Sequence, residues 1–217
     1  MKKRKVITKV LGPVETNVYL VGSTETGKCV VVDPADDAGE IISCIEENGF
    51  KPEALLLTHG HSDHFMAAED LKKKYGIPLC ALDREKETLS DPEFNTSESI
   101  LGFPAAAKAN RFFRDGDVLH FAGTDWNVIA TPGHTIGGCC YYLPEEGILF
   151  SGDTLFRGSY GRTDFPGGDA GQLISSVLKI LTLPEDTVVY PGHMETTTIG
   201  YEKKYNPISV YERQKEK

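Results

Sequence analysis

The alternation of hydrophobic and polar residues predicts a chain in which strands dominate and helices are interspersed in both halves. Apolar and β-branched runs predict strands over residues 17–22, 28–33, 54–57, 118–121, 126–131, 139–143, 148–151 and 187–190. Apolar residues at helical spacing predict helices over residues 38–48, 65–75 and 173–181. This pattern suits two sheets sandwiched between helices, although periodicity alone does not select that architecture.

Segment 83–110 has no clear hydrophobic period and is rich in Ser, Pro, Ala and Asn. We expect a loop or irregular helices that reach over a site, and the sequence does not define their role. No low-complexity tract or linker divides the chain, and 217 residues are enough for one sizeable core. We therefore expect a single domain over residues 1–217.

The composition excludes some classes of partner. The formal net charge of −9 lacks the basic footprint of a general nucleic-acid-binding protein. The first residues, MKKRKVITKV, resemble the start of a signal peptide, but Lys9, Pro13 and Glu15 interrupt the apolar stretch that should follow. No window reaches the ~18 apolar residues of a membrane span. We expect a cytoplasmic protein with no nucleic-acid or membrane partner, and the sequence does not indicate its oligomeric state.

The five cysteines show no metal-binding or redox spacing. We expect them to be buried as small hydrophobic residues in a reducing compartment. Cys139 and Cys140 are adjacent in a predicted strand, so only one of the two is expected to face the core.

The segment HGHSDH follows the predicted buried strand over residues 54–57 and holds three of the six histidines. In an extended chain His59 and His61 point to the same side, while Asp63 and His64 come where the chain turns into a helix. The alternative is a polar surface loop with Asp63 as a helix N-cap. Desolvating so many polar groups without a partner is costly, so the motif favours a metal site.

Three further residues of ligand type follow predicted strands. His134 lies in TPGHT, Asp153 in SGDT and His193 in PGH. Each alone is a weak signal, because an Asp after a Gly is often a turn residue. Together they stand on loops at strand ends, where function is usually carried. The remaining histidine, His120, lies within a predicted strand and is interpreted as structural.

The order of these motifs resembles the metallo-β-lactamase superfamily and extends from His59 to His193. The resemblance implies an α/β fold, an αββα sandwich of two mixed sheets flanked by helices, with two metal ions at one edge. It implies that the first ion is held by His59, His61 and His134. It implies that the second is held by Asp63, His64 and His193, with Asp153 as the bridge.

Within the superfamily, the segments GDTLF and GRTDF resemble the glyoxalase II (hydroxyacylglutathione hydrolase) group. Longer enzymes of that group add a helical domain that binds glutathione. Only about two dozen residues follow His193, so the resemblance is to the compact form and the identity of the thiol stays open. Arg162 stands where those enzymes carry a lysine that contacts the thiol cofactor, which implies a substrate-binding role. The tyrosines that assist there are not matched, since Asp164 and Glu195 occupy the nearest places, and Arg162 could instead simply pair with Asp164.

The chemistry follows from this donor set. Nitrogen and oxygen ligands without a thiolate suit zinc, with iron or manganese as alternatives. Two divalent ions can share a hydroxide, oriented by Asp63, that attacks a thioester carbonyl. A thiol with a pKa of ~8.5 departs without a dedicated general acid. We therefore expect a hydroxyacyl-thioester hydrolase that acts on a small-molecule thioester.

The main alternative is a mononuclear iron persulfide dioxygenase. His59, His134 and Asp153 alone would form the two-histidine, one-carboxylate arrangement that holds ferrous iron, and persulfide dioxygenases resemble this chain in the GRTDF loop. Lactonase, β-lactamase and nuclease activities rank lower. A binding protein without catalysis is a separate alternative that is disfavoured, because such proteins usually lose ligands first and this chain keeps all seven.

Overall fold

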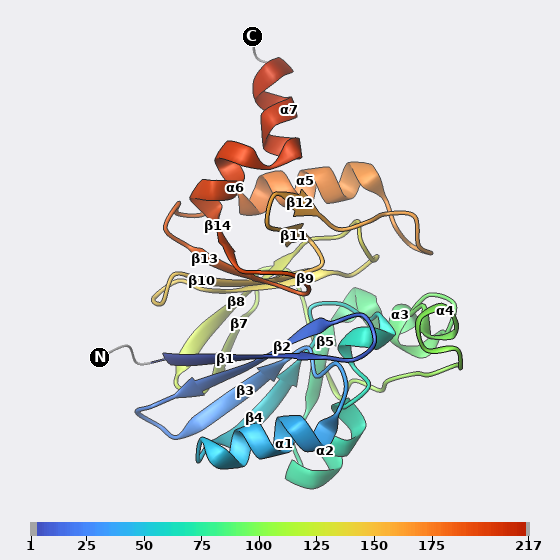
Figure 1. Cartoon of the computed structure of the whole chain (residues 1–217), viewed down its shortest axis with the longest axis vertical. Helices are drawn as coiled ribbons and strands as arrows, with labels where there is room; N and C mark the ends of the chain where they lie inside the picture. Colours follow the sequence, from blue (N-terminus) through green and yellow to red (C-terminus); the bar gives the residue numbers. More distant parts are fainter. Residues whose placement is uncertain (1–3, 216–217) are drawn as a thin grey trace.

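A computed structural model describes residues 4–215. Two six-stranded sheets face each other, and helices cover the outer face of each, which gives the αββα order of layers (Figure 1). This is the architecture that the motifs implied. The α/β prediction is therefore confirmed, with two mixed sheets between two layers of helices.

The first sheet mixes antiparallel and parallel pairing. In spatial order it contains β1 (Arg4–Leu11), β2 (Thr16–Ser23), β3 (Lys28–Val32), β4 (Lys51–Leu56), β5 (Leu79–Leu82) and β6 (Arg111–Phe113). The pairs from β1 to β3 are antiparallel, and those from β3 to β6 are parallel. Residues 54–57 are fully buried, as expected for an apolar strand segment covered on both faces.

The second sheet brings the ends of three strands to one edge. Its spatial order is β14 (Thr197–Thr198), β13 (Val188–Pro191), β10 (Ile148–Gly152), β9 (Cys139–Leu143), β8 (Thr124–Ala130) and β7 (Val118–Phe121). Both β8 and β10 run antiparallel to β9, and β13 runs parallel to β10. The carboxyl ends of β8, β10 and β13 therefore lie at the same edge. A small hairpin, β11 (Leu155–Phe156) and β12 (Ser159–Tyr160), follows β10.

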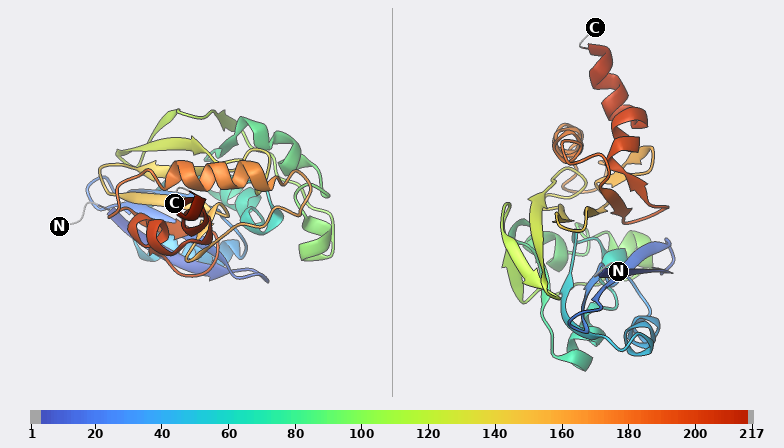
Figure 2. Two further views of the ribbon diagram at one scale, coloured as in Figure 1. Left: turned by 90° about the horizontal axis from the view of Figure 1, so that it is seen from above. Right: turned by 90° about the vertical axis from the view of Figure 1, so that its left-hand side faces the viewer.

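The helices pack outside the sheets. On the first sheet lie α1 (Ala38–Glu47) and α2 (Ala68–Tyr75), and on the second α5 (Ala170–Ile180) and α6 (Ile199–Tyr205) (Figure 2). Helix α7 (Pro207–Lys215) projects from the body at the C-terminal end (Figures 1 and 2). Between β5 and β6 lie the 3₁₀ turn Asp83–Glu85 and the short helices α3 (Lys86–Ser90) and α4 (Ser97–Leu101).

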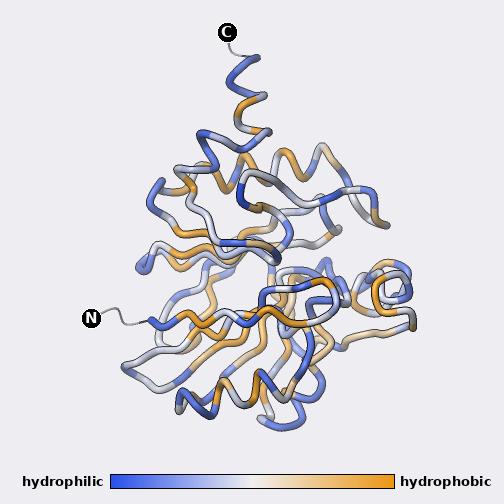
Figure 3. The backbone as a smooth tube through the Cα atoms, viewed as in Figure 1, coloured by the Kyte–Doolittle hydropathy of each residue, from blue (hydrophilic) through white to orange (hydrophobic). Residues whose placement is uncertain are grey.

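The apolar residues form layers that match this order (Figure 3). Between the sheets, Trp126 stacks on Phe150 at 5.7 Å between ring centroids. Cys139 faces this inter-sheet layer, whereas Cys140 packs with α5 on the other face. All five cysteines are free and buried. Cys140 is buried as well as Cys139, because helices cover the face of the sheet that Cys140 occupies. The expectation that only one of the pair faces a core was therefore wrong.

The predicted strands and helices are present, most of them with shifted ends. The helix predicted over residues 65–75 begins only at Ala68, because Ser62–His64 first forms a 3₁₀ turn. Strands β1, β5, β6, β11, β12 and β14 and helices α6 and α7 were not predicted. Within residues 4–215, no helix is long and apolar enough to cross a membrane.

Candidate metal centre

All seven residues predicted as metal ligands come from loops at the carboxyl ends of strands. His59, His61, Asp63 and His64 follow β4; His134 follows β8, Asp153 follows β10 and His193 follows β13. Backbone hydrogen bonds join these loops across the two sheets. The amide of Cys139 donates to the carbonyl of Thr58 at 2.8 Å. The amide of Asn17, in β2, donates to the carbonyl of Gly192 at 2.7 Å.

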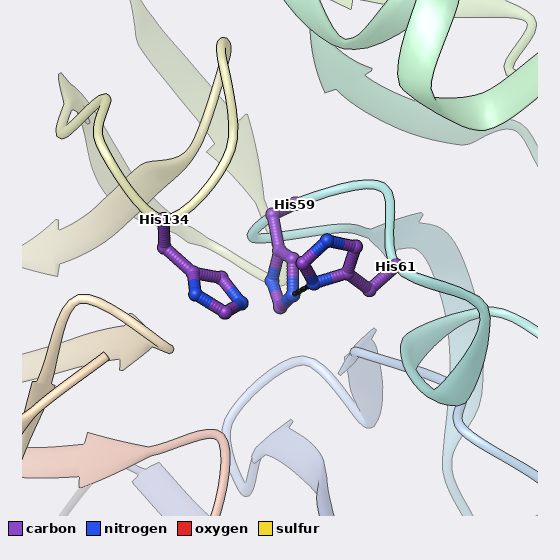
Figure 4. A group of neighbouring side chains, drawn as sticks. All are labelled: His59, His61 and His134. Atoms are coloured by element: carbon purple, nitrogen blue, oxygen red, sulfur yellow. Dashed lines mark hydrogen bonds between the residues drawn. The ribbon is translucent and has the colours of Figure 1, made fainter. Parts of the chain in front are cut away.

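The first group consists of His59, His61 and His134, whose ligand nitrogens lie within 4.8 Å of one another. Figure 4 shows the three rings converging, His134 from one loop and the other two from the loop after β4. The nearest pair, His59 Nε2 and His61 Nδ1, is 3.1 Å apart. Two nitrogens bound tetrahedrally to one zinc, each at about 2.0–2.1 Å, would lie about 3.3 Å apart. The spacing therefore suits a shared ion.

The second group consists of Asp63, His64 and His193, again within 4.8 Å. Asp63 Oδ2 lies 3.4 Å from His64 Nε2 and 3.3 Å from His193 Nε2. Asp153 lies between the groups. Its Oδ2 is 3.5 Å from His134 Nε2, and its Oδ1 is 3.5 Å from His64 Nε2.

Several of these atoms are buried without a hydrogen-bond partner. They include His64 Nε2, His134 Nε2 and Asp153 Oδ1. Buried polar atoms are nearly always hydrogen-bonded, because leaving them unpaired costs free energy. Atoms of this type, converging on common points, fit a divalent cation.

The electrostatics differ between the two groups. Burial, together with the neighbouring imidazoles, holds the pKa values of His59 and His61 well below the usual range. Burial would also lower the pKa of His64, but the carboxylates of Asp63, Asp33 and Asp153 outweigh it and raise this pKa to about 10. Burial would raise the pKa of Asp63, but His64 and His193 hold it below its usual range.

Neighbouring groups fix the imidazole rings. His134 Nδ1 donates to the carbonyl oxygen of Arg162 at 2.7 Å, which leaves the lone pair of Nε2 facing the cluster. His64 Nδ1 lies 3.1 Å from Asp33 Oδ2. Asp33 in turn accepts from the amide and hydroxyl of Thr58, each at 2.8 Å. These contacts orient the donor atoms toward the presumed ions.

The sequence profile described as the metallo-beta-lactamase superfamily matches residues 11–193. The chain belongs to this superfamily. It is thus a member of a metallo-hydrolase superfamily with a metal-binding cluster of His and Asp residues.

Curated relatives of this superfamily member span most of its length. It is 37% identical over 197 residues to the hydroxyacylglutathione hydrolase GloC of Haemophilus influenzae, covering 89% of this chain and 92% of that protein. It is 36% identical over 200 residues to the probable metallo-hydrolase YqgX of Bacillus subtilis, covering 91% and 94%.

Solved structures of the superfamily agree with the fold. The B3 metallo-beta-lactamase BLEG-1 has a TM-score of 0.90 at 38% identity, covering 95% of this chain and all of that one. TTHA1623 in a di-iron-bound form has a TM-score of 0.83 at 34% identity, covering 93% and 98%. ETHE1 from Myxococcus xanthus has a TM-score of 0.80 at 28% identity, covering 95% and 85%.

A cavity of about 370 Å³ opens over the cluster. Its apolar lining comes from Val14, Ile100, Phe156, Tyr160, Phe165 and Met194, and its polar lining includes Arg162. The Arg162 guanidinium forms two 2.6 Å hydrogen bonds with the Asp164 carboxylate. It also lies over the ring of Phe165 at 4.0 Å from the centroid. Arg162 is thus at the cavity, and the ion pair considered as its alternative role is present.

Two residues that contact the cluster, Asp33 and Thr16, were not predicted from the sequence. Asp33 is buried directly after β3 and contacts His64, while the Thr16 hydroxyl donates to Asp63 Oδ2 at 2.9 Å. Asp33 ends the run VVVD, so an acid after a buried strand was the available signal. Thr16 offered none. His120 is exposed and pairs with Asp125 at 2.6 Å, away from the cluster.

Proposed function

We propose that this protein is a binuclear metal-dependent hydrolase that cleaves hydroxyacyl thioesters. The observation that carries the proposal is the position of Asp153, whose two carboxylate oxygens each lie 3.5 Å from a histidine of a different group. A carboxylate in this place can bridge two ions. Similarity to a hydroxyacylglutathione hydrolase over most of both chains supports the thioester substrate.

The residues divide into two ligand sets. His59, His61 and His134 would hold the first ion, Asp63, His64 and His193 the second, and Asp153 both. When bound, two such ions would supply a hydroxide at neutral pH and polarise the substrate carbonyl. Zinc is the metal we favour for both sites. Asp63 orients the attacking group, because the Thr16 hydroxyl fixes its carboxylate at 2.9 Å.

The lining of the cavity offers different contacts to two parts of the substrate. Apolar side chains such as Phe156 and Phe165 line the cavity beside the cluster, where they would exclude water and contact the acyl and thiol carbons of a bound substrate. Arg162 is the cation among the described residues that line this cavity, so it would bind a carboxylate of the thiol part. To do so it must exchange its partner Asp164 for the substrate.

The leaving group needs little assistance. A thiol with a pKa of ~8.5 leaves as a thiolate beside a cation without being protonated first. Among the described lining residues, the carboxylates are Asp63 and Asp153, which both belong to the metal cluster. The absence of a further carboxylate among the described lining residues favours a thioester over a substrate with a poorer leaving group.

A second candidate is an iron-dependent persulfide dioxygenase. His59, His134 and Asp153 would form its two-histidine, one-carboxylate site. His134 Nε2 lies 3.5 Å from Asp153 Oδ2, and the ring centroids of His59 and His134 are 4.9 Å apart. The loop GRTDF, which resembles that of persulfide dioxygenases, is the observation that favours this candidate.

Two assays on one preparation separate the candidates. Purified protein of known metal content is given S-lactoylglutathione while free thiol is measured, and glutathione persulfide while oxygen uptake is measured. We expect thiol release and no oxygen uptake. Oxygen-dependent persulfide turnover without thioester cleavage would reverse the order of the two candidates.

A further inference from the structure

A buried glutamate with no role in the proposed chemistry lies beside the metal cluster. Glu85 ends the 3₁₀ turn Asp83–Glu85, in the segment whose role the sequence left open, and is fully buried. Burial raises the pKa of its carboxyl group, although hydrogen bonds from Thr135 and Gly137 oppose this. Burying a carboxyl group is costly, so its contacts need an explanation.

One oxygen of Glu85 holds the loop that carries His134. Oε1 accepts from the hydroxyl of Thr135 at 2.5 Å and from the amide of Gly137 at 2.7 Å. Thr135 is the next residue after His134. A shift of Glu85 would therefore shift the loop that aims the His134 ring at the cluster.

The other oxygen faces the loop that carries His59 and His61. A Cβ atom added to Gly60, between these two histidines, would lie 2.6 Å from Glu85 Oε2. A Cβ atom added to Gly137, in the other loop, would lie 2.7 Å from the backbone nitrogen of Glu85. Real Cβ atoms do not approach so closely, so each loop has a glycine at the point where Glu85 packs.

The same segment contacts the first loop once more. The amide of Ser62, next to His61, donates to the carbonyl of Asn95 at 2.8 Å. Asn95 is fully buried, and its side chain is held by Ser97 and Ala105 within the segment. Segment 83–110 thus supports the ligand loops from the side.

We propose that Glu85 is a positioning residue that sets the spacing between His134 and the pair His59 and His61, and so determines the affinity of the first metal ion. The inference rests on the proposed metal centre. Glu85 touches no presumed ligand atom and acts through Thr135, Gly137 and Gly60. The second group depends on it less, because His193 lies on a loop to which Glu85, among the described residues, makes no hydrogen bond, and because Asp63 and His64 lie in the 3₁₀ turn that follows His61.

The test compares Glu85→Gln with Glu85→Met. The glutamine keeps an acceptor in the place of Oε1, to which both hydrogen bonds run. The methionine fills a similar volume but keeps neither bond. Zn²⁺ affinity is measured by competition with a chromogenic chelator on the whole protein. Loss of groups that orient ligands typically weakens metal binding about 10- to 100-fold. We expect Glu85→Met to weaken one of two Zn²⁺ equivalents by about tenfold or more, and Glu85→Gln to restore most of that affinity.

Glu202→Met is the matched control. Glu202 is also fully buried and also accepts from a threonine hydroxyl, that of Thr197 at 2.6 Å, and from the amide of Gly158. Its partners lie in β14, directly after α6 and in the turn between β11 and β12, none of them in a ligand loop. We expect a lower Tm for both methionine variants, and weaker Zn²⁺ binding only for Glu85→Met.

Thr135→Val provides the same test with a smaller change, should Glu85→Met not fold. It removes one of the two hydrogen bonds and keeps the carboxylate. Wild-type Zn²⁺ affinity in Glu85→Met, or in Thr135→Val, would overturn the inference and leave the metal centre standing. Equal weakening in Glu202→Met would assign Glu85 a merely structural role. A wild-type protein that binds no Zn²⁺ would overturn both the centre and the inference.

Discussion

The two halves of the metal cluster are built from different chemistry. The first is a set of imidazoles in which burial holds the pKa values of His59 and His61 low, so these donors are neutral. The second mixes histidines with carboxylates, and the carboxylates around His64 raise its pKa to about 10. Asp153 lies between the halves.

This difference shows that the halves are stabilised in different ways. The second half has internal charge complementarity, since His64 lies among Asp33, Asp63 and Asp153. Among the described residues of the first half, only His134 has such a contact, with the shared Asp153 at 3.5 Å, and the rings are oriented mainly by neutral contacts, such as that between His134 and the carbonyl of Arg162. We therefore expect the first half to be sensitive to geometry and the second to charge.

Removing the shared residue should have the largest effect. We expect Asp153→Ala to reduce the affinity for both ions and to lower kcat/KM by about a thousandfold or more, because a bound ion supplies several kcal/mol of charge stabilisation. Metal analysis after gel filtration, together with thioester hydrolysis, checks this. A variant that keeps two ions per chain would show that Asp153 does not bridge them.

Removing one presumed ligand from each half in turn should show that the two halves respond differently. We expect His61→Ala and His193→Ala each to retain close to one ion, but a different one. His61 is 2% exposed, whereas the side chain of His193 is 20% exposed at the cavity. His61→Ala should therefore lower the Tm more, since it leaves a buried cavity. Metal analysis and thermal unfolding measure both effects, and identical behaviour of the two variants would remove the distinction between the halves.

The smallest effects should come from the exposed ion pair at the cavity. Arg162→Ala should raise KM about tenfold for a thioester with carboxylates, with kcat largely kept, because a charged hydrogen bond is lost from the bound substrate. Asp164→Asn should lower that KM about two- to fivefold, because it removes a weak competing partner.

Asp125→Asn is the control for the Asp164 change, since it removes one negative charge at the start of β8, the end opposite the ligand loop. Steady-state kinetics give both constants for each variant. A collapse of kcat in Arg162→Ala, or loss of metal, would mean that the Arg162 side chain holds the loop whose carbonyl contacts His134 and does not bind the substrate.

Much of the fold could be predicted because its strands are marked by local pattern. Residues 118–121 and 139–143 have the bounds that alternation and apolar runs predicted. Strand β1 was missed because Lys5 and Lys9 lie on an edge strand that is half exposed, so its charged residues hide the period. The burial of Cys140 depends on α5, which is distant in sequence.

The presumed ligands could be predicted because each lies in a short motif directly after a strand. The residues that hold these ligand loops in place could not be predicted. Glu85 lies in an unpatterned segment and meets Thr135 and Gly137 some fifty residues later in the chain. Such partners are defined by the packing of the two ligand loops and by no local sequence signal.

The most direct test of the central claim is a Zn²⁺ titration of metal-free protein under nitrogen, with hydrolysis of S-lactoylglutathione measured at each step. A binuclear hydrolase needs no oxygen, so we expect thiol release to rise until two equivalents are bound and then to stay constant. Full activity at one equivalent would contradict the binuclear account. No activity at any Zn²⁺ level, with turnover of a persulfide on addition of ferrous iron and oxygen, would contradict the hydrolase itself.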